Sequence, residues 1–455
     1  MTIDCTDLKN RIHNFFFYDT CDVNTVGIEL EFPIVNLDGK YDKTYDILLE
    51  LSFYIEHELK FTKKEQYLFE KEETRDKISF EYSANTLEFS MEKSLSLFEI
   101  YIRFRHYFKK IQEYLLTRKY ILTGMGMHPH WRKICTNALD TSRYKTIEHY
   151  LCEYNKYLYG DFCAYTCSVQ THISPPIIGL IPNILNVFSF LSMIKGYLFS
   201  NSVDLYPDSH FINTVCCRDY LWLNSKFAIH KNNVGYYRKG NDKIEDVIDD
   251  ILERTLYYIY RNSRCWYIGP YKIKDYFSKD KIKACDIISG EEVVFSTDIN
   301  DLNSFRSYKF IETTKRRTIE IRDDCQQPVF DCFSPAAFNI GIYENIDEVK
   351  IIARDMCQDL GINFFDFLNN RNIATSINCI FSKKTLVYYL DKFYELAYLG
   401  LKKRNRNEEK LLKNFFWIRN SYKSPGIYSY ENIMLKRSNL TKLVEYFSCT
   451  DVEDF

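Results

Sequence analysis

Glycine is scarce in this sequence, and no glycine-rich phosphate-binding signature is present. Only 15 of the 455 residues are glycine. Neither G-x-x-x-x-G-K-[ST] nor G-x-G-x-x-G occurs, and the GMG at 124–126 is too short to hold a phosphate alone. If the chain binds a nucleotide, metal ions and arginines must therefore hold its phosphates.

The cysteines do not form a metal or catalytic signature. Fifteen are present without a single C-x-x-C, and G-x-S-x-G and H-E-x-x-H are also missing. The odd number, and an N-terminus without the basic-then-apolar order of a signal peptide, favour free thiols in a reducing cytoplasm. A Cys–His nucleophile pair stays an alternative, although free buried cysteines are more common.

Strong net charge and a convincing membrane segment are missing as well. Sixty basic residues face sixty-two acidic ones, which gives no reason to expect a nucleic acid or an anionic membrane as partner. One apolar run, residues 176–194, approaches the length of a membrane span. It contains Pro182, Asn183 and Asn186 and is therefore predicted to be a buried helix.

The composition is that of a globular protein with a large core. Hydrophobic residues make up 46% and aromatic residues 16% of the chain, enough to fill a core and line a pocket. The length allows one large domain or two to three ordinary ones, and no repeat or Pro/Gly-rich linker divides it. We expect a domain at 1–375 and a helical extension at 376–455 packed on it, with one single domain as the alternative.

Hydrophobic periodicity predicts the order of the elements. Alternating or apolar segments predict strands at 25–35, 78–90, 120–129 and 162–174 and two more near 306–323. A period of three to four predicts helices at 45–60, 93–118, 143–158, 178–199 and 243–261, with a mostly helical remainder. The charged run at 401–412 is read as a solvated turn or helix face. Because strands and helices do not alternate strictly, the pattern favours an α+β fold.

Four of the expected strands carry polar residues on one face only. These residues are Glu29 and Glu31 in GIELEF, Glu88 in NTLEFS (with Glu81 seven residues earlier), Gln170 and His172 in SVQTHIS, and Glu320 and Arg322 in TIEIRD. Taken singly, each is most simply a surface position on a half-exposed strand. Together they predict a sheet with one charged face, where oxygen ligands gather around hard cations. Residues i and i+2 lie about 6.6–7 Å apart on a strand, so two neighbouring acids suit two neighbouring magnesium ions.

The ordered set of motifs resembles a known family. GIELEF, TLEF, GMGMHP, RYKTIEHY, VQTHIS and TIEIRDDCQ follow one another over residues 25 to 330. They are similar to the motifs of carboxylate–amine ligases related to bacterial and plant-type glutamate–cysteine ligases. That resemblance implies a glutamine synthetase-like fold, shared with guanidino kinases, in which an antiparallel sheet curves into a catalytic funnel flanked by helices.

The resemblance also implies a set of ligands and roles. ATP would bind with two or three magnesium ions, manganese being an alternative ion. Glu29 and Glu320 would hold one metal and Glu31 and Glu88 another, with Glu81 at the position of a further acidic ligand in some relatives. Arg322 would contact the transferred phosphate, so Arg322 and Glu320 are the expected catalytic pair.

The segment SVQTHIS departs from the family pattern. Many relatives read H-V-H-[VI]-G there, so that His172 matches the second histidine and Gln170 replaces the first, the usual metal ligand. An amide oxygen can bind magnesium, and plant-type relatives also carry glutamine. Either residue therefore remains a candidate ligand, and a structural role is the alternative for His172.

Two further residues are expected near the substrate. RDYLW at 218–222 is similar to a family R-x-x-W element, which makes Arg218 a candidate clamp for a substrate carboxylate. His128, in GMGMHPHW, either lines the pocket or fixes its loop, and the sequence favours neither role over the other.

The resulting prediction is a cytoplasmic ATP- and magnesium-dependent ligase that forms an amide through an acyl phosphate. The resemblance makes the γ-carboxylate of glutamate the leading donor and cysteine or another amino acid the acceptor. The alternatives are a phosphotransferase of the same fold and an inactive relative that binds an amino acid or a protein. Small molecules are the expected partners, and a homo-oligomer is compatible with the sequence.

Overall fold

A computed structural model describes residues 5–17, 24–152, 160–206, 211, 213–230, 232–237, 240–379, 382–413 and 415–450. Within these residues the main sheet has nine strands, all in antiparallel pairs, in the order β14-β15-β7-β1-β5-β4-β3-β2, with β6 also on β1. Its strands are β1 (Val26–Asn36), β2 (Thr62–Glu65), β3 (Leu68–Glu70), β4 (Lys77–Phe80), β5 (Thr86–Ser94), β6 (Tyr120–Leu122), β7 (Ser168–Ile173), β14 (Ile311–Thr313) and β15 (Ile319–Cys325).

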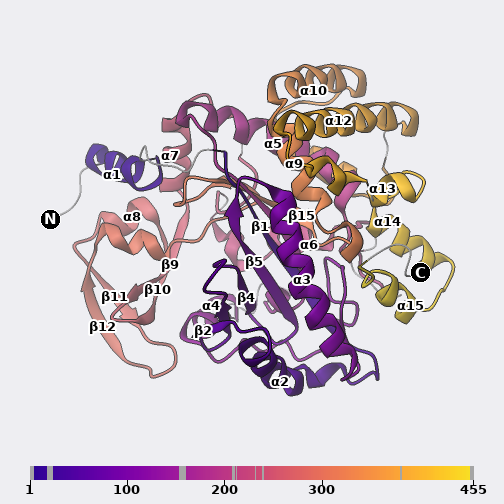
Figure 1. Ribbon diagram of the computed structural model, residues 1–455. Coiled ribbons are helices and arrows are strands. Elements are labelled where there is room, and N and C mark those ends of the chain that lie inside the picture. The colour runs from indigo at the N-terminus through magenta and orange to yellow at the C-terminus, as the bar shows by residue number, and fades with distance from the viewer. Residues whose placement is uncertain are drawn as a thin grey trace.

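Two smaller sheets accompany the main one. The four-stranded antiparallel sheet has the order β12-β11-β10-β9, and β8 pairs with β13 in parallel. Their strands are β8 (Val234–Gly235), β9 (Thr255–Arg261), β10 (Arg264–Lys272), β11 (Lys281–Cys285), β12 (Glu292–Ser296) and β13 (Tyr308–Lys309). In Figure 1 the four-stranded sheet lies on the opposite side of the main sheet from helices α13 to α15.

The helices flank the main sheet, with α3 lying along β1 and β5 (Figure 1). They are α1 (Cys5–Phe17), α2 (Thr44–His57), α3 (Leu97–Leu116), α4 (Ser142–Cys152), α5 (Ile181–Phe199), α6 (Cys217–Leu223), α7 (Ile244–Leu252), α8 (Ile273–Phe277), α9 (Ser334–Tyr343), α10 (Ile346–Leu360), α11 (Phe367–Ala374), α12 (Lys383–Arg404), α13 (Phe416–Arg419), α14 (Pro425–Ser429) and α15 (Leu440–Tyr446). The expected mixture of helices and antiparallel strands is thus confirmed.

Packing on one face of the main sheet orients the polar residues to the other. Phe32 of β1 and Phe89 of β5 contact Phe104 and Phe108 of α3, with ring centroids 5.0–6.0 Å apart. Each buried phenylalanine contributes about 1.5–3 kcal/mol of transfer free energy. Because side chains alternate along a strand, burying Phe32 on the helix side turns Glu31 toward the opposite face. The hydrophobic core therefore fixes where the acids of the sheet point.

The apolar run expected as a core helix is α5. Helix residues Ile178–Phe199 are long and apolar enough to span a membrane, yet 72% of the most apolar window is buried inside the protein. The helix packs against β15 and α11. Its burial agrees with the role of a core helix that supports the sheet from behind.

One predicted element was wrong. The helix expected over 243–261 ends at Leu252, and residues 255–261 form strand β9. Thr-Leu-Tyr-Tyr-Ile-Tyr is rich in β-branched and aromatic residues, and pairing with β10 overrides its helical spacing. The run at 401–412 comprises the end of α12, a turn and a short 3-10 helix, and most of its residues are exposed or half-buried, as predicted. Glu408 is an exception, because it is buried, binds Arg404 at 2.6 Å and accepts a bond from the Leu97 amide at 2.7 Å.

Other predicted boundaries shift. The strand expected over 120–129 covers only residues 120–122, and the one expected over 162–174 begins at Ser168. The helix expected over 143–158 is described as far as Cys152, and residues 153–159 lie outside the described part. The C-terminal helix α12 packs against α9 and α10, while the proposed boundary at residue 375 stays a prediction.

The buried carboxyl group of Asp331 leads to a pH prediction. Asp331 accepts hydrogen bonds from Ser334 and from the Phe416 amide, the latter at 2.9 Å, and burial raises its pKa to about 8. An unfolded aspartate titrates near 3.9, so between about pH 4 and 8 the folded chain holds a proton that the unfolded chain has released. Stability therefore falls across this window as the pH rises, by up to about 1.4 kcal/mol per unit.

Asp331→Asn is expected to flatten this dependence, since the amide cannot ionise and can still accept the bond from Phe416. Urea unfolding at several pH values between about 5 and 8 measures it. An unchanged slope in the variant would contradict the raised pKa.

Candidate active site

The central strands bring the predicted acids together across the sheet. In the register of β1 with β5, Glu31 lies directly opposite Glu88. In the register of β7, Gln170 lies opposite Glu29 of β1, and His172 lies opposite Glu320 of β15. Four neighbouring strands, in the order β15-β7-β1-β5, therefore supply one polar face.

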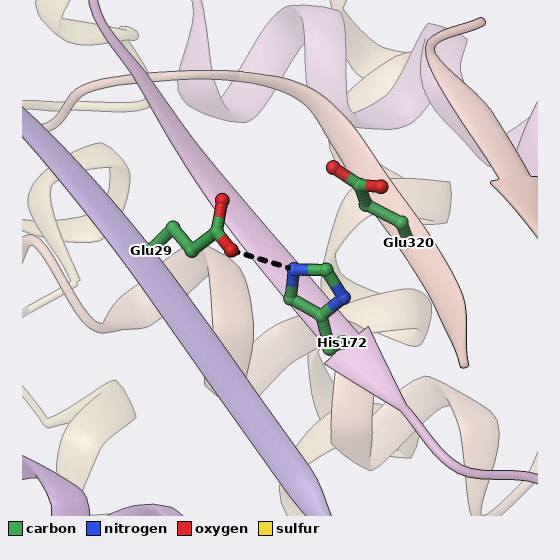
Figure 2. A group of neighbouring side chains, drawn as sticks. All are labelled: Glu29, His172 and Glu320. Atoms are coloured by element: carbon green, nitrogen blue, oxygen red, sulfur yellow. Dashed lines mark ion pairs between the residues drawn. The ribbon is translucent and has the colours of Figure 1, made fainter. Parts of the chain in front are cut away.

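One group of this face is suited to a metal ion. Glu29, His172 and Glu320 each offer a ligand atom, and these atoms lie within 4.8 Å of one another. Figure 2 shows the three side chains pointing toward a common point from three strands, with Glu29 Oε1 3.4 Å from His172 Nε2. Two carboxylates and one imidazole form a donor set that fits a divalent cation.

The charges within this group shift the pKa values of Glu29 and His172. Burial raises the pKa of Glu29, but the His172 hydrogen bond and charge outweigh it and bring the pKa down to about 2. Burial lowers the pKa of His172, whereas Glu29 and Glu320 raise it above the ordinary value. Because a metal-binding histidine must be neutral, a cation bound here would replace the proton that the charges of Glu29 and Glu320 favour on His172.

A second group of acids lies farther along β1. Burial raises the pKa of Glu31 to about 7, with Arg218 opposing and Glu81 adding to the rise. Burial also raises the pKa of Glu88 well above its usual value, reinforced by Glu81, Glu29 and Glu31. Buried carboxylates that lie close together repel one another, so they favour either a proton or a bound cation between them. Glu81 itself accepts a hydrogen bond from the Tyr144 hydroxyl at 2.8 Å.

Gln170 and His172 belong to different groups. The Gln170 amide donates to Glu31 Oε1 at 2.9 Å, and its own Oε1, although buried, has no hydrogen-bond partner. Ser168 holds the other oxygen of Glu31 through its amide at 2.7 Å and its hydroxyl at 3.0 Å. His172 therefore accompanies Glu29 and Glu320, whereas Gln170 accompanies Glu31 and offers an unpaired amide oxygen beside it.

Arg322 lies on the same face as the acids. Its Nε is 3.8 Å from Glu320, one Nη is 3.9 Å from Glu312, and that Nη donates to the Ser307 carbonyl at 3.1 Å. The guanidinium group lies between the carboxylates of Glu320 and Glu312, whose charges raise its pKa. Glu31 and Glu29, on the same face of the sheet, raise this pKa further. A cation in this position is suited to the charge of a transferred phosphoryl group.

Two adjacent cavities open onto these residues. The larger, of about 770 Å³, is lined by Glu29, Glu31, Glu81, Glu88, Gln170, His172, Arg218, Glu320 and Arg322 among others. The smaller, of about 630 Å³, shares six lining residues with the larger, namely Glu29, Lys77, Ser90, His172, Lys315 and Arg316, and is also lined by Arg75, Lys93 and Arg317 among others. Glu29 and His172 thus belong to a wall common to both cavities. Nine of the ten predicted site residues thus line the larger cavity.

Arg218 and His128 have different surroundings. Arg218 is the second residue of helix α6, is 3% exposed, and leaves one buried Nη without a hydrogen-bond partner. His128 is not among the residues that line either of these two cavities. Its Nε2 contacts the Ile34 carbonyl at 3.1 Å and its Nδ1 accepts from the His130 amide at 3.1 Å. Of the two roles weighed for His128, the geometry favours fixing the loop, and burial lowers its pKa to about 3.

Sequence reasoning missed several lining residues. Glu312 of β14 lies directly opposite Glu320, is 4% exposed, and has its pKa raised to about 7 by burial. It is held by the buried Arg254 at 2.9 Å. In YKFIET a period of two places Glu312 on the same face as Phe310, so alternation does not mark it as a residue of a polar face. Arg143 and Lys315 lie on loops or helix ends, where no periodicity marks them.

The fold and this face of acids and arginines agree with the expected class. Residues 25–176, about a third of the chain, match the model of glutamate-cysteine ligase family 2 (GCS2). The match confirms the resemblance and supports an ATP-dependent ligase that forms carbon–nitrogen bonds. No curated protein matches the chain significantly.

Two solved structures are similar to the chain. The glutamate–cysteine ligase of Francisella tularensis, solved in complex with AMP, is 11% identical, with a TM-score of 0.49 over 95% of this chain and 89% of that one. The bifunctional glutathione synthetase of Pasteurella multocida is 10% identical, with a TM-score of 0.44 over 98% of this chain and 53% of that one.

Proposed function

We propose that the protein is an ATP- and magnesium-dependent ligase that joins a carboxylate to an amine through an acyl phosphate. The observation that carries this proposal is the convergence of two acid groups and Arg322 on one cavity. A binding module has no need of so many buried carboxylates on one wall. The main sheet would then be the wall of a glutamine synthetase-like funnel.

Two magnesium sites are assigned to the two groups of acids. Glu29, His172 and Glu320 would hold one ion, and Glu31, Glu88 and Glu81 would surround a second, with the free Gln170 oxygen beside them. Bound magnesium would neutralise phosphate charge and orient the reacting groups. The raised pKa values of Glu31 and Glu88 support this assignment, because a cation relieves the repulsion that burial leaves between them.

The smaller cavity suits the nucleotide. Its six basic residues can balance a triphosphate, and it meets the larger cavity at six shared residues, namely Glu29, Lys77, Ser90, His172, Lys315 and Arg316. The γ-phosphate would therefore sit at the shared wall, within reach of Arg322. No glycine-rich loop is required for this arrangement, in agreement with the scarcity of glycine.

The larger cavity suits the donor and the acceptor. A donor carboxylate oxygen attacks the γ-phosphorus, the bond to the β–γ bridging oxygen breaks, and ADP leaves with its electron pair. The amine then attacks the acyl carbon and phosphate departs as the amine proton is lost. Arg322 would neutralise the phosphoryl charge, and Arg218 would hold the non-reacting carboxylate of an amino-acid donor such as glutamate.

The test is magnesium-dependent ADP release from the purified chain with a panel of amino-acid donors and amines, with products identified by mass spectrometry. The expected result is ADP release that needs both donor and amine and yields an amide. A phosphorylated product without an amide would favour the phosphotransferase. Absence of ADP release with every pair would remove the basis for catalysis.

A further inference from the structure

Arg371 of helix α11 joins the two elements that carry Arg218 and Arg322. Its side chain is buried, and its Nε donates to Asp219, the residue after Arg218 on α6, at 2.7 Å. One Nη donates to the backbone carbonyl of Asp323, the residue after Arg322 on β15, also at 2.7 Å. A single guanidinium group therefore bridges the start of α6 and the end of β15.

Further contacts hold this guanidinium group from other sides. The second Nη donates to the Ser192 carbonyl of α5 at 2.8 Å and lies 3.6 Å from the Asp323 carboxylate. The first Nη also lies 3.6 Å from the sulfur of Cys216, the residue that caps α6. Gly196 lets α5 come close, because a Cβ there would lie 3.4 Å from the Arg371 Cδ. The donor directions of a guanidinium are fixed in one plane, so these bonds hold α5, α6 and β15 at a set spacing.

Arg371 lies behind the site rather than in it. It is not among the residues that line either cavity, whereas Arg218 and Arg322 both line the larger one. Any effect of Arg371 on a reaction in this cavity must therefore act through the positions of those two arginines.

The spacing of the two arginines matters for the proposed reaction. There, Arg218 holds the non-reacting carboxylate of the donor and Arg322 faces the transferred phosphoryl group, so the donor must span the gap between them. An error of about 1 Å in the position of a reacting group can cost about 100-fold in rate. One methylene lengthens a donor by less than a single bond of about 1.5 Å, which is an error of that size.

We propose that Arg371 is a positioning residue that sets the spacing between Arg218 and Arg322, and thereby the chain length of the dicarboxylic amino acid used as donor. This assignment rests on the proposed function. A shift of α6 against β15 would change which donor places its reacting carboxylate against the phosphoryl group. It would leave the smaller cavity, assigned to the nucleotide, unchanged.

The test compares aspartate, glutamate and 2-aminoadipate as donors, with one active amine, in wild type, Arg371→Lys and Asp219→Asn. Wild type is expected to prefer one chain length by about 100-fold or more in kcat/KM for ADP release. In Arg371→Lys the preference should fall below about 10-fold, chiefly through a lower kcat with the favoured donor, because an ammonium lacks the planar fork. The KM for ATP should stay the same.

Asp219→Asn is the milder variant for the case that Arg371→Lys does not fold. The amide oxygen can still accept from Arg371, but the charge is gone, so the preference should fall in the same direction by a smaller factor. A merely structural role would lower the amount of active enzyme and hence the rate with all three donors alike. Only a changed spacing alters the ratio between donors.

Arg404→Lys is the matched control. The Arg404 side chain is 7% exposed, binds Glu408 at 2.6 Å and Glu344 at 2.9 Å, and is not among the residues that line either cavity. This variant should lose stability but keep the wild-type preference, and thermal unfolding compares the losses.

An unchanged ratio between donors in the folded variants contradicts the assignment, and so does equal use of all three donors by wild type. ADP release only with donors that lack a second carboxylate would overturn the assignment but leave the proposed function standing. Absence of ADP release in wild type with every pair would overturn the proposed function itself.

Discussion

Glu320→Gln is expected to lower the rate of ADP release by about 100- to 1000-fold while leaving the protein folded. The substitution keeps the shape of the side chain but removes the charge that faces Glu29 and His172 in the predicted metal site. It also removes the carboxylate 3.8 Å from the Arg322 Nε, which helps to orient that guanidinium. The unfolding midpoint should stay the same or rise, because Glu312 loses a repulsive neighbour.

The measurement is coupled-assay ADP release at saturating substrates, together with the magnesium concentration that gives half-maximal rate. Glu292→Gln is the matched control, since Glu292 is an exposed glutamate on strand β12 of the second sheet. It should behave as wild type. Wild-type rates in Glu320→Gln at every magnesium concentration would refute the metal-binding role of this residue.

Lys195→Met is expected to destabilise the protein by about 3–5 kcal/mol. Lys195 of α5 is fully buried and binds Asp323 and Asp324, two fully buried acids at the end of β15. Removing the ammonium group leaves both carboxylates without their main cation, although Arg371 remains 3.6 Å from Asp323. The lower unfolding midpoint in urea or on heating measures the loss.

Lys384→Met, at an exposed position on α12, is the control and should change stability little. Adding Asp324→Asn to Lys195→Met should recover part of the lost stability, since it removes one of the two stranded charges. A Lys195→Met variant as stable as wild type would show that the buried acids do not depend on this lysine.

Sequence reasoning was strongest where side-chain direction follows from a period of two. In GIELEF and TIEIRD the apolar residues must enter the core, so the direction of Glu29 and Glu320 follows from Ile28 and Ile321. Periodicity did not show that these strands lie next to each other in the sheet, because strand pairing depends on contacts between residues distant in the sequence. The family resemblance supplied the expectation of adjacency, which the registers of β1, β7 and β15 now provide.

The remaining features depend on tertiary contacts. TLYYIYR has apolar residues at both helical and strand spacings, and pairing with β10 decides for the strand. Arg143 lies at a helix start and Lys315 in a turn, where burial and direction are set by the neighbours alone. The sequence also did not show that Gln170 contacts Glu31 whereas His172 contacts Glu29. That difference depends on where the two acids lie in the structure.

The positions of Glu29, His172 and Glu320 in the sequence determine when the proposed metal site can be completed during synthesis. The segment that matches the family model ends at residue 176, so it contains two of the three proposed ligands and lacks the third. During synthesis from the N-terminus, the proposed ion-binding centre would therefore stay incomplete until the chain has passed residue 320 and β15 has joined β7. If the centre binds an ion tightly, that binding would report that the long-range, slow part of folding is finished.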